Sequence, residues 1–425
     1  MGLGGPSAAR RSETVLRRVA ARAAGCRATF VRGRPVSQLV RGRLHASHVQ
    51  ARAMFGVGGA EPGPCDGASA PGRDWFSNLF HFSERKDKRD VRSELTNLHK
   101  FLEVEEQPDG LVLKSKISGY GYAIGRFDCP SLAQLRADPL VAAARARGGK
   151  LRLSIQCGDV AEIHADPRNA AATFQAASQF NCLEFVGPDV VPEDGVTGYS
   201  SDRTQGPACS IACGPATVYR NYFVTGNGLP DGQVGQTADA MIDNLDDLNR
   251  ALGNEDGRMI TVKGGYTLAT DAGLDAMRGA IESKDREYLK GLLKVGVHSD
   301  VEVTASRWGT QPVGRASFAE PPGPGHKVTQ IFASACSVNY SRNHPGRWQP
   351  FAQLVVEAAY EATLMAAAKV AEQHRYEGAS AVVYLTLVGG GALDLLPCAR
   401  IVAADTTQAP VLSDLAEFDR DATQA

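Results

Sequence analysis

The stretch from residue 327 to residue 391 decides the fold, because it holds two apolar runs of strand length joined by a helix. KVTQIFASA (327–335) is the first run, PFAQLVVEAAYEATLMAAA (350–368) has apolar residues at helical spacing, and AVVYLTL (381–387) is the second run, which ends at Gly389. A helix that joins two buried strands is typical of parallel pairing. We therefore expect an α/β fold with a mostly parallel sheet, in which ligands bind beyond the carboxyl ends of the strands.

Shorter segments that precede this stretch in the sequence predict further strands and helices. VGVHSDVEVT (295–304) and LRLSI (151–155) read as strands, and residues 111–127 read as a strand pair broken by glycines. Residues 131–147 predict a helix with Ser131 as its N-cap. Leucines spaced by three and four residues predict another helix over 86–106.

The first 52 residues differ in composition from the rest of the chain. They hold eleven Arg, no Lys and one acid, Glu13, a balance of +10, so the net charge of −1 leaves −11 for the remainder. An Arg-rich, acid-poor segment with Val15, Leu16 and Val19 at helical spacing is typical of a cleavable transit peptide. We expect an intracellular protein, in a mitochondrion or plastid if this leader is a transit peptide and otherwise in the cytoplasm.

Composition also divides the rest of the chain. Residues 53–85 begin with a Gly- and Pro-rich run and predict a flexible linker. The chain from 86 to 405 is then expected to form one α/β domain, followed by a tail over 406–425. The acidic balance of this part argues against nucleic-acid binding, and no apolar run is long enough to predict a membrane span.

The nine cysteines follow no disulfide or zinc pattern. Cys209 and Cys213 are four residues apart, and no second pair stands at metal-ligand spacing. We expect reduced thiols, no metal site and no cofactor.

The glycine triplet Gly389, Gly390 and Gly391 follows a buried strand, where backbone N–H groups free of side chains can bind a diphosphate. The triplet is not a Walker A loop, because no Lys followed by Ser or Thr comes after it. A simple turn out of the strand is the alternative interpretation.

The helix at 350–368 and the run VVYLTLVGGGA (382–392) together resemble the final helix, strand and phosphate loop of macrodomain-like proteins, including the poly(ADP-ribose) glycohydrolase branch. Upstream, NAAATFQAASQFNCLEF (169–185) and DRTQGPACSIACG (202–214) are similar to the ribose-binding strand end and the loop and helix after it. The run after Gly391 lacks the aromatic residue and the Gly-Asn of that family. The resemblance implies a three-layer α/β/α macrodomain-like mixed sheet with flanking helices.

The resemblance also implies which residues contact a ligand. Asn181 would hydrogen-bond a ribose hydroxyl, Gln205 and Gly206 would form part of a first phosphate or ribose loop, and the glycine triplet would form the second. The ligand would be ADP-ribose, a related NAD-derived nucleotide, or an ADP-ribosylated protein. An Asn that caps its own turn is the alternative for Asn181.

A carboxylate near the ribose would add hydrolysis to binding. Glu184 stands three residues after Asn181, and Asp194 and Asp202 lie in the following polar loop. A carboxyl group at this place can activate water or stabilise the oxocarbenium-like transition state of glycosidic hydrolysis. A solvated loop charge or a helix cap is the alternative for each acid.

Three other classes of function stay open at this point. A non-catalytic reader of ADP-ribose would share every binding residue and lack the catalytic carboxylate. A Cys-dependent hydrolase or transferase would use Cys182 or Cys209 with His164, His298 or His326 as its base. A protein without a nucleotide ligand would use the glycine triplet as a turn only.

Overall fold

The computed structural model describes residues 50–54 and 74–389, apart from 88–89, 91, 109, 149–151, 157, 203, 305–324 and 375–381. The chain divides into two compact units, Met1–Ala46 and Ser47–Ala425, and every described residue lies in the second unit. The expected tail at 406–425 lies outside the described residues, as do Gly390, Gly391 and most of the expected leader.

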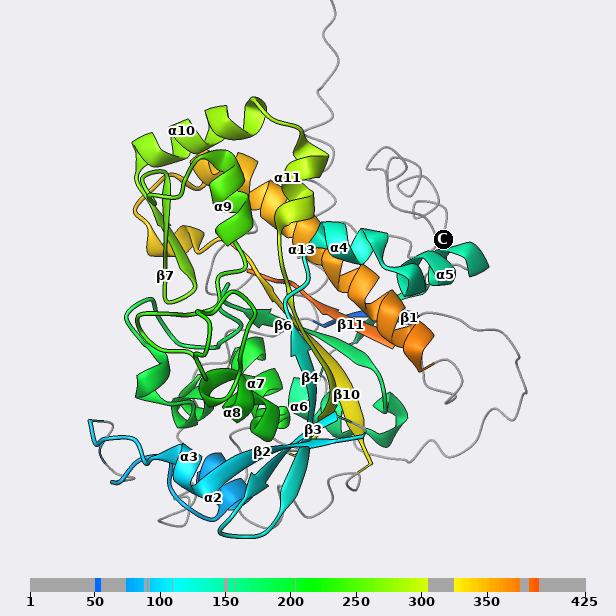
Figure 1. The fold of residues 1–425 in the computed structure, drawn as a ribbon. Helices are drawn as coiled ribbons and strands as arrows, with labels where there is room; N and C mark the ends of the chain where they lie inside the picture. The colour runs from blue at the N-terminus through cyan, green and yellow to red at the C-terminus, as the bar shows by residue number, and fades with distance from the viewer. Residues whose placement is uncertain are drawn as a thin grey trace, which may run out of the picture. The chain divides into compact units, whose positions relative to one another are not determined.

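The described residues form a nine-stranded mixed sheet in the order β2-β3-β4-β9-β10-β6-β11-β1-β5 (Figure 1). Strands β10, β6, β11, β1 and β5 are parallel, while β9 pairs antiparallel with both β10 and β4, and β2, β3 and β4 form an antiparallel meander. The strands are β1 (Gln50–Met54), β2 (Leu102–Gln107), β3 (Gly110–Ser115), β4 (Gly121–Asp128), β5 (Arg152–Gln156), β6 (Thr173–Ser178), β9 (Gly296–Glu302), β10 (Lys327–Ser334) and β11 (Val382–Thr386). The predicted α/β class with a mixed sheet is confirmed.

Helices cover both faces of the sheet, and each face has its own apolar cluster. One cluster includes residues of α4 (Leu132–Ala137), α5 (Pro139–Arg147), α9 (Asp246–Leu252), α10 (Asp271–Glu282), α11 (Arg286–Leu292) and α13 (Pro345–Gln373). The other includes residues of α2 (Trp75–Phe80), α3 (Leu98–Phe101), α6 (Val160–Ala165), α7 (Gln205–Ala212) and α8 (Gly214–Tyr222). A separate hairpin is formed by β7 (Ile260–Lys263) and β8 (Tyr266–Ala269). No helix in the described ranges is long and apolar enough to cross a membrane.

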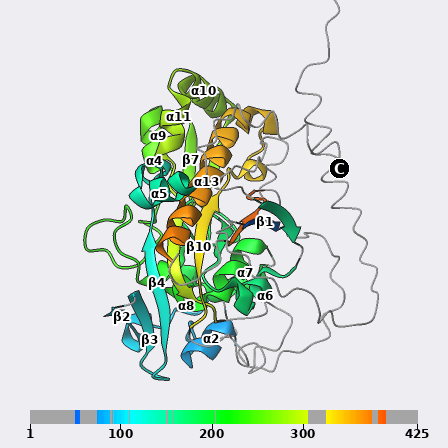
Figure 2. The ribbon, with the colours of Figure 1, turned by 90° about the vertical axis from the view of Figure 1, so that its right-hand side faces the viewer.

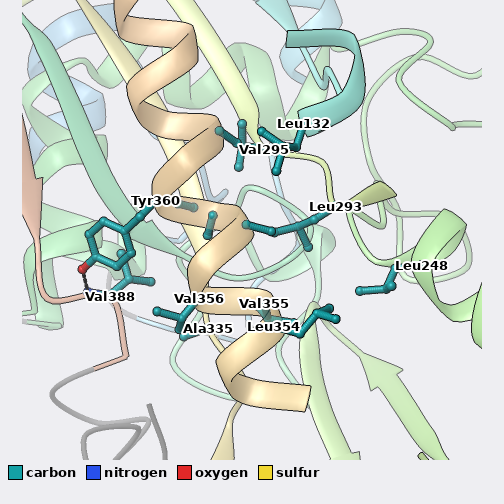
Figure 3. Close-up of a cluster of buried hydrophobic side chains, with 14 of the residues drawn as sticks. Leu132, Leu248, Leu293, Val295, Ala335, Leu354, Val355, Val356, Tyr360 and Val388 are labelled. Carbon is teal, nitrogen blue, oxygen red and sulfur yellow. Dashed lines mark hydrogen bonds between the residues drawn. The ribbon is translucent and has the colours of Figure 1, made fainter. Parts of the chain in front are cut away.

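The long helix α13 packs along β10, and the two lie side by side in Figure 2. Its apolar side, with Leu354, Val355 and Val356 at its centre, is buried because apolar residues recur at helical spacing (Figure 3). The hydroxyl of Tyr360 donates to the Thr386 carbonyl oxygen and accepts from the Val388 N–H at 3.1 Å. This helix therefore anchors the segment that leads out of β11.

The structure differs from the sequence prediction at the end of the expected leader and within the expected linker. Strand β1 spans residue 52, where we expected the leader to end, and lies between β11 and β5. Helix α2 falls inside the segment expected to be a linker, and its aromatic side chains Trp75, Phe76 and Phe80 are buried. Helix α2 belongs to the folded unit because its apolar side chains pack in the cluster on one face of the sheet.

The prediction of a helix over 86–106 is wrong. Only Leu98–Phe101 is helical, and Leu102–Gln107 forms β2, paired with β3 through the register of Val104 with Leu113. Cross-strand pairing with β3 supplies the hydrogen bonds of this segment, and it overrides a leucine spacing that suits a helix equally well. The expected helix from Ser131 is divided at Asp138 into α4 and α5, and Ser131 forms the predicted N-cap.

Candidate functional site

The carboxyl ends of β6, β10 and β11 meet at one edge of the sheet because these strands are parallel. The chain leaves β6 toward α7 and α8 on one face and leaves β10 toward α13 on the other, so the connections diverge between two neighbouring strands. Such divergence opens a crevice at the carboxyl edge, which is where ligands of open α/β sheets bind. The segment after β6 and Gly389 after β11 both lie at this edge.

Strands β6 and β11 separate toward this edge. Their ladder contains only two registered pairs, and the side chain of Gln205 takes the place of β11 beyond them. Its Oε1 accepts from the Ala177 N–H at 2.8 Å, and its Nε2 donates to the Gln175 carbonyl oxygen at 2.9 Å. Gln205, expected to contact a ligand, thus uses both ends of its amide on the backbone of β6.

A tight turn after β6 directs Glu184 back toward the sheet. The Cys182 N–H donates to the Gln179 carbonyl oxygen at 3.0 Å, and Cys182 has a left-handed backbone with φ of 60°. The Asn181 side chain is fully buried, and its Oδ1 accepts from the Leu183 N–H at 3.1 Å. Asn181 therefore stabilises the turn that positions Glu184, as the alternative interpretation of this residue described.

Glu184 is the side chain of this site that is best suited to acid–base chemistry. Its side chain is 1% exposed, and neither carboxyl oxygen has a hydrogen-bond partner among the described residues. Burial raises the pKa of Glu184 to about 8, although the positive charge of Arg220 and the nearby Ser178 hydroxyl act to lower it. The Ser178 hydroxyl donates to the Gln179 carbonyl oxygen at 3.1 Å. A buried acid with a strongly shifted pKa and unused oxygens is a functional-site candidate.

Two groups of the following loop and helix contact Glu184, and a third acts on it through its charge. The Tyr199 hydroxyl accepts from the Glu184 N–H at 2.8 Å, and the negative charge of Asp202 contributes to the raised pKa of Glu184. Asp202 also accepts from the Thr204 N–H at 2.8 Å and so directs the chain into α7. Gly206 is buried, and a Cβ there would overlap the Glu184 carboxyl group. The structure thus places Gly206 against Glu184, while Asp202 acts on Glu184 only through its charge.

Asp194, the third expected catalytic acid, is exposed and has a local role. Its Oδ2 accepts from the Val191 N–H at 2.9 Å across the short 3₁₀ turn Pro192–Asp194. Its backbone carbonyl oxygen accepts a hydrogen bond from Arg85. These contacts match the helix-cap alternative that the sequence left open for this residue.

Arg220 carries a buried positive charge that sequence reasoning missed. The guanidinium donates to the Cys182 carbonyl oxygen at 3.2 Å and to the Ser210 hydroxyl at 3.0 Å, and it lies 3.8 Å from the centre of the Phe332 ring. No carboxylate in the described part of the chain lies within salt-bridge distance of it. Its charge acts instead through space on Glu184 and is the main opposing influence on the pKa of that acid.

Glu84 fixes the loop that precedes α7. This buried carboxylate accepts from the Val196 N–H at 2.9 Å, from the N–H and hydroxyl of Thr197, and from the Tyr222 hydroxyl at 2.8 Å. Burial raises the pKa of Glu84 despite these hydrogen bonds. The segment after α2 thereby holds the loop that carries Tyr199 over the site.

The three histidines considered as catalytic bases are buried and hydrogen-bonded within the core. His164, His298 and His326 each bond a backbone carbonyl oxygen through one ring nitrogen, those of Val160, Ile124 and His164 respectively. Burial lowers the pKa of His164 to about 4 and holds the pKa of His298 well below its usual value. Within the described residues, none of the three hydrogen-bonds the thiol of Cys182 or Cys209.

A hollow of about 550 Å³ opens at the same edge of the sheet, beyond the end of β4. Its lining includes Cys129 and two ion pairs, Lys294 with Asp247 at 2.6 Å and Lys369 with Asp138 at 2.9 Å. No sequence motif indicated this hollow, because its walls come from five separate segments of the chain. Among the described residues, no group of three or more His, Cys, Asp or Glu side chains could hold a metal ion.

Comparisons with known proteins place no constraint on the site. No protein-family model matches the chain, and no curated protein or solved structure matches it.

Proposed function

We propose that this protein binds ADP-ribose or a related NAD-derived nucleotide at the carboxyl edge of β6 and β11, and that it hydrolyses glycosidic bonds to the ribose. The observation that carries the proposal is Glu184, a buried acid with both carboxyl oxygens unpartnered at the edge where open α/β sheets bind ligands. A stable core gains nothing from such a group, because a buried polar atom without a partner costs about 1–3 kcal/mol.

The raised pKa of Glu184 suits the role of general acid. With a pKa of about 8, the carboxyl group is mostly protonated at neutral pH and can give its proton to the oxygen or nitrogen that leaves the ribosyl carbon. The carboxylate that remains then faces the positive charge that develops on that carbon. The nearby charge of Arg220 limits the rise of the pKa and keeps the proton transferable.

The binding half of the proposal is supported by two backbone features at the same edge. Gly389 has a φ of 75°, which favours glycine, and it begins the triplet that resembles a macrodomain phosphate loop. Helix α7 directs its N-terminal turn toward β6, and Gly206 in that turn permits close approach to Glu184. Helix N-termini and glycine loops are the usual partners of phosphate groups.

A Cys-dependent hydrolase receives less support. The thiol of Cys209 accepts from Gln205 Nε2 at 3.1 Å, and burial holds its pKa well above the usual value, so a reactive thiolate is disfavoured. Neither Cys209 nor Cys182 hydrogen-bonds a histidine among the described residues.

Calorimetric titration of ADP-ribose into the full chain tests binding, with AMP and NAD as comparison ligands. We expect micromolar affinity for ADP-ribose, about −8 kcal/mol. Gly390→Glu, which adds a negative charge to the proposed phosphate loop, should abolish the binding heat. An absence of heat with ADP-ribose at millimolar concentration would refute the nucleotide-binding proposal.

Release of ADP-ribose from a mono-ADP-ribosylated protein tests turnover. Glu184→Gln keeps the shape of the side chain but cannot supply the acid's proton, so it should retain binding and lose release. Glu106→Gln, at an exposed position of β2, is the matched control and should behave like the unchanged chain. Binding with no release by the unchanged chain would favour the non-catalytic reader.

A further inference from the structure

Gln179, the first residue after β6, has an amide whose orientation is fixed by Tyr266. Gln179 Nε2 donates to the Tyr266 hydroxyl at 3.3 Å, and this hydroxyl donates to the Phe185 carbonyl oxygen at 2.5 Å. Burial raises the pKa of Tyr266, so the hydroxyl keeps its proton, and that proton is used on Phe185. Gln179 can therefore meet the hydroxyl only with an N–H, which settles the end of the amide that carries Oε1.

The Oε1 atom of Gln179 is buried and has no hydrogen-bond partner among the described residues, although the residue as a whole is half-buried. Both carboxyl oxygens of Glu184 share this lack of a partner. Buried polar atoms nearly always have a partner, so three unpartnered oxygens on one short segment of chain require an explanation. All three atoms can accept hydrogen bonds, and a ligand that carries donors would supply what they lack.

Gln179 and Glu184 lie at the same end of β6. A Cβ at Gly206 would overlap both the Glu184 carboxyl group and the carbonyl oxygen of Ala177, so the acid lies close to the last residues of the strand. Gln179 is two residues after Ala177, and the hydroxyl that orients its amide also bonds Phe185, the residue next to Glu184. The amide and the carboxyl group therefore belong to one site at the carboxyl edge of the sheet.

The turn of the β7–β8 hairpin holds Gln179 in place. Gly265 in this turn has a φ of 80°, and its carbonyl oxygen accepts from the Phe180 N–H at 3.0 Å. A Cβ at Gly265 would lie 2.7 Å from the Cβ of Gln179, so the turn packs directly on this side chain. Thr267 and Ser337 exchange two hydrogen bonds, at 3.3 Å and 2.9 Å, and so attach the hairpin to the segment after β10. A side chain supported in this way offers a preorganised acceptor.

The chemistry of these atoms selects the part of a nucleotide that binds here. An amide oxygen can only accept a hydrogen bond, and phosphate groups offer acceptors and negative charge, so a phosphate gains nothing from Gln179 Oε1. The hydroxyl groups of a sugar are donors. A ribose therefore fits this end of β6 better than the diphosphate does.

We propose that Gln179 is a specificity-determining residue, whose Oε1 accepts a hydrogen bond from a hydroxyl group of the ribose on which Glu184 acts. This inference rests on the proposed function, because it assigns a ligand contact within the same site. It adds a requirement for the substrate, which must carry a free hydroxyl next to the reacting carbon of the ribose or one position further.

Calorimetric titration of the full chain tests the contact with ADP-ribose and with its 2-deoxy and 3-deoxy analogues, which lack one hydroxyl of that ribose. In the unchanged chain, one analogue should bind about tenfold more weakly than ADP-ribose, because one hydrogen bond is lost. In Gln179→Met, ADP-ribose should bind as weakly as that analogue, and the difference between the two ligands should disappear. The same preference for ADP-ribose in both proteins would overturn the inference, as would equal affinity of the unchanged chain for all three ligands.

Urea unfolding separates this role from a structural one. Gln179→Met has a similar shape and removes a buried oxygen that has no partner, so the variant should be at least as stable as the unchanged chain. Loss of stability together with loss of affinity would mean that the amide supports the fold and would contradict the inference. Gln107→Met, at an exposed position of β2, is the matched control and should change neither affinity nor stability.

A conservative variant gives a second test. Gln179→Glu keeps an acceptor oxygen at the same position, so it should keep the preference for ADP-ribose over the deoxy analogue even where its added charge weakens the binding of both. Loss of this preference in Gln179→Glu would contradict the inference. If Gln179→Met fails to fold, Gln179→Ala takes its place in the titrations.

The titrations also distinguish this inference from the proposed function. No heat with ADP-ribose in the unchanged chain would refute nucleotide binding, and the role of Gln179 with it. Binding by the unchanged chain with the same affinity in Gln179→Met would refute only the role of Gln179, and nucleotide binding would stand.

Discussion

Gly206 lies so close to Glu184 that any side chain at residue 206 would overlap the buried carboxyl group. The same Cβ would also overlap the carbonyl oxygen of Ala177 in β6, so the first turn of α7 rests directly on the strand. Glycine at this position is thus a requirement of close packing, and it allows the helix to cover the acid without a side chain between them.

Gly206→Ala should destabilise the fold. The added methyl group meets backbone that cannot move without shifting α7 from β6, and overpacking of this kind costs about 1–3 kcal/mol. Denaturant unfolding measures the change. Gly198→Ala is the matched control, because a Cβ at residue 198 meets nothing within 4 Å. Equal stability of the two variants would show that α7 does not pack on β6 as described.

The contribution of Glu184 to the stability of the chain should fall as pH rises from about 4.5 to about 8. The pKa of Glu184 is raised from 4.5 to about 8 in the folded state, so the folded state holds this proton more tightly than the unfolded state does. The stability gained by holding the proton is complete below the unfolded pKa and is lost as pH passes through the folded pKa. At about 1.4 kcal/mol per pKa unit, the full shift corresponds to about 5 kcal/mol.

Glu184→Gln removes this titration, so the variant should be more stable than the unchanged chain at pH 8.5 and closer to it at pH 5. Urea unfolding at both pH values measures the difference. Glu106→Gln, at an exposed site, should leave the pH slope unchanged. The same slope in Glu184→Gln and the unchanged chain would contradict the buried state of this acid.

Gln205→Glu should destabilise the chain although the two side chains have the same shape. The carboxylate can accept from the Ala177 N–H but cannot donate to the Gln175 carbonyl oxygen, which it would repel. We expect a loss of about 1–3 kcal/mol in the free energy of unfolding. Gln107→Glu, exposed on β2, is the control. A loss no greater than that of the control would mean that β6 finds other partners at this edge.

Glu84→Ala should release the loop that carries Tyr199. Removal of the carboxylate leaves the N–H groups of Val196 and Thr197 without their acceptor, at a cost of about 1–3 kcal/mol for the buried Val196 group. Hydrogen exchange should speed up at these two amides first. Glu94→Ala, which removes an exposed ion pair with Lys86, should leave their exchange unchanged.

Long, regular patterns in the sequence predicted most of the parallel half of the sheet. Strands β10 and β11 and helix α13 were recognisable because each has a single strong apolar pattern and clear ends. Strand β2 was missed because Leu98 and Leu102 are spaced as in a helix, and only pairing with β3 decides between the two structures. The boundary at residue 52 was misplaced because the polar composition of the leader does not reveal that residues 50–54 have strand partners on both sides.

The candidate site could be predicted only in part. The sequence pointed to Glu184 and Gly206, which lie against each other, and to Asp202, which acts on Glu184 only through its charge. The resemblance assigned ligand contacts to Asn181 and Gln205, whose amides the structure uses in a turn and in β6. The role of Arg220 and the contact of Glu84 with Val196 could not be predicted from the sequence. In both cases the partners are separated by long stretches of chain, and no local pattern marks them. Long-range contacts of single polar residues leave no periodic signal in a sequence.

The pairing of strand β1 on both sides determines what a cut near residue 52, where the sequence predicts the end of a leader, would do to the sheet. A cut after residue 52 would divide β1, which is the partner of both β11 and β5 in the described sheet. Both neighbours would then present unpaired N–H and C=O groups along an open slot, and an open strand edge can accept a strand from another chain. Processing at this point would therefore convert a self-contained sheet into one competent for strand exchange or for aggregation, unless the cut falls before residue 50.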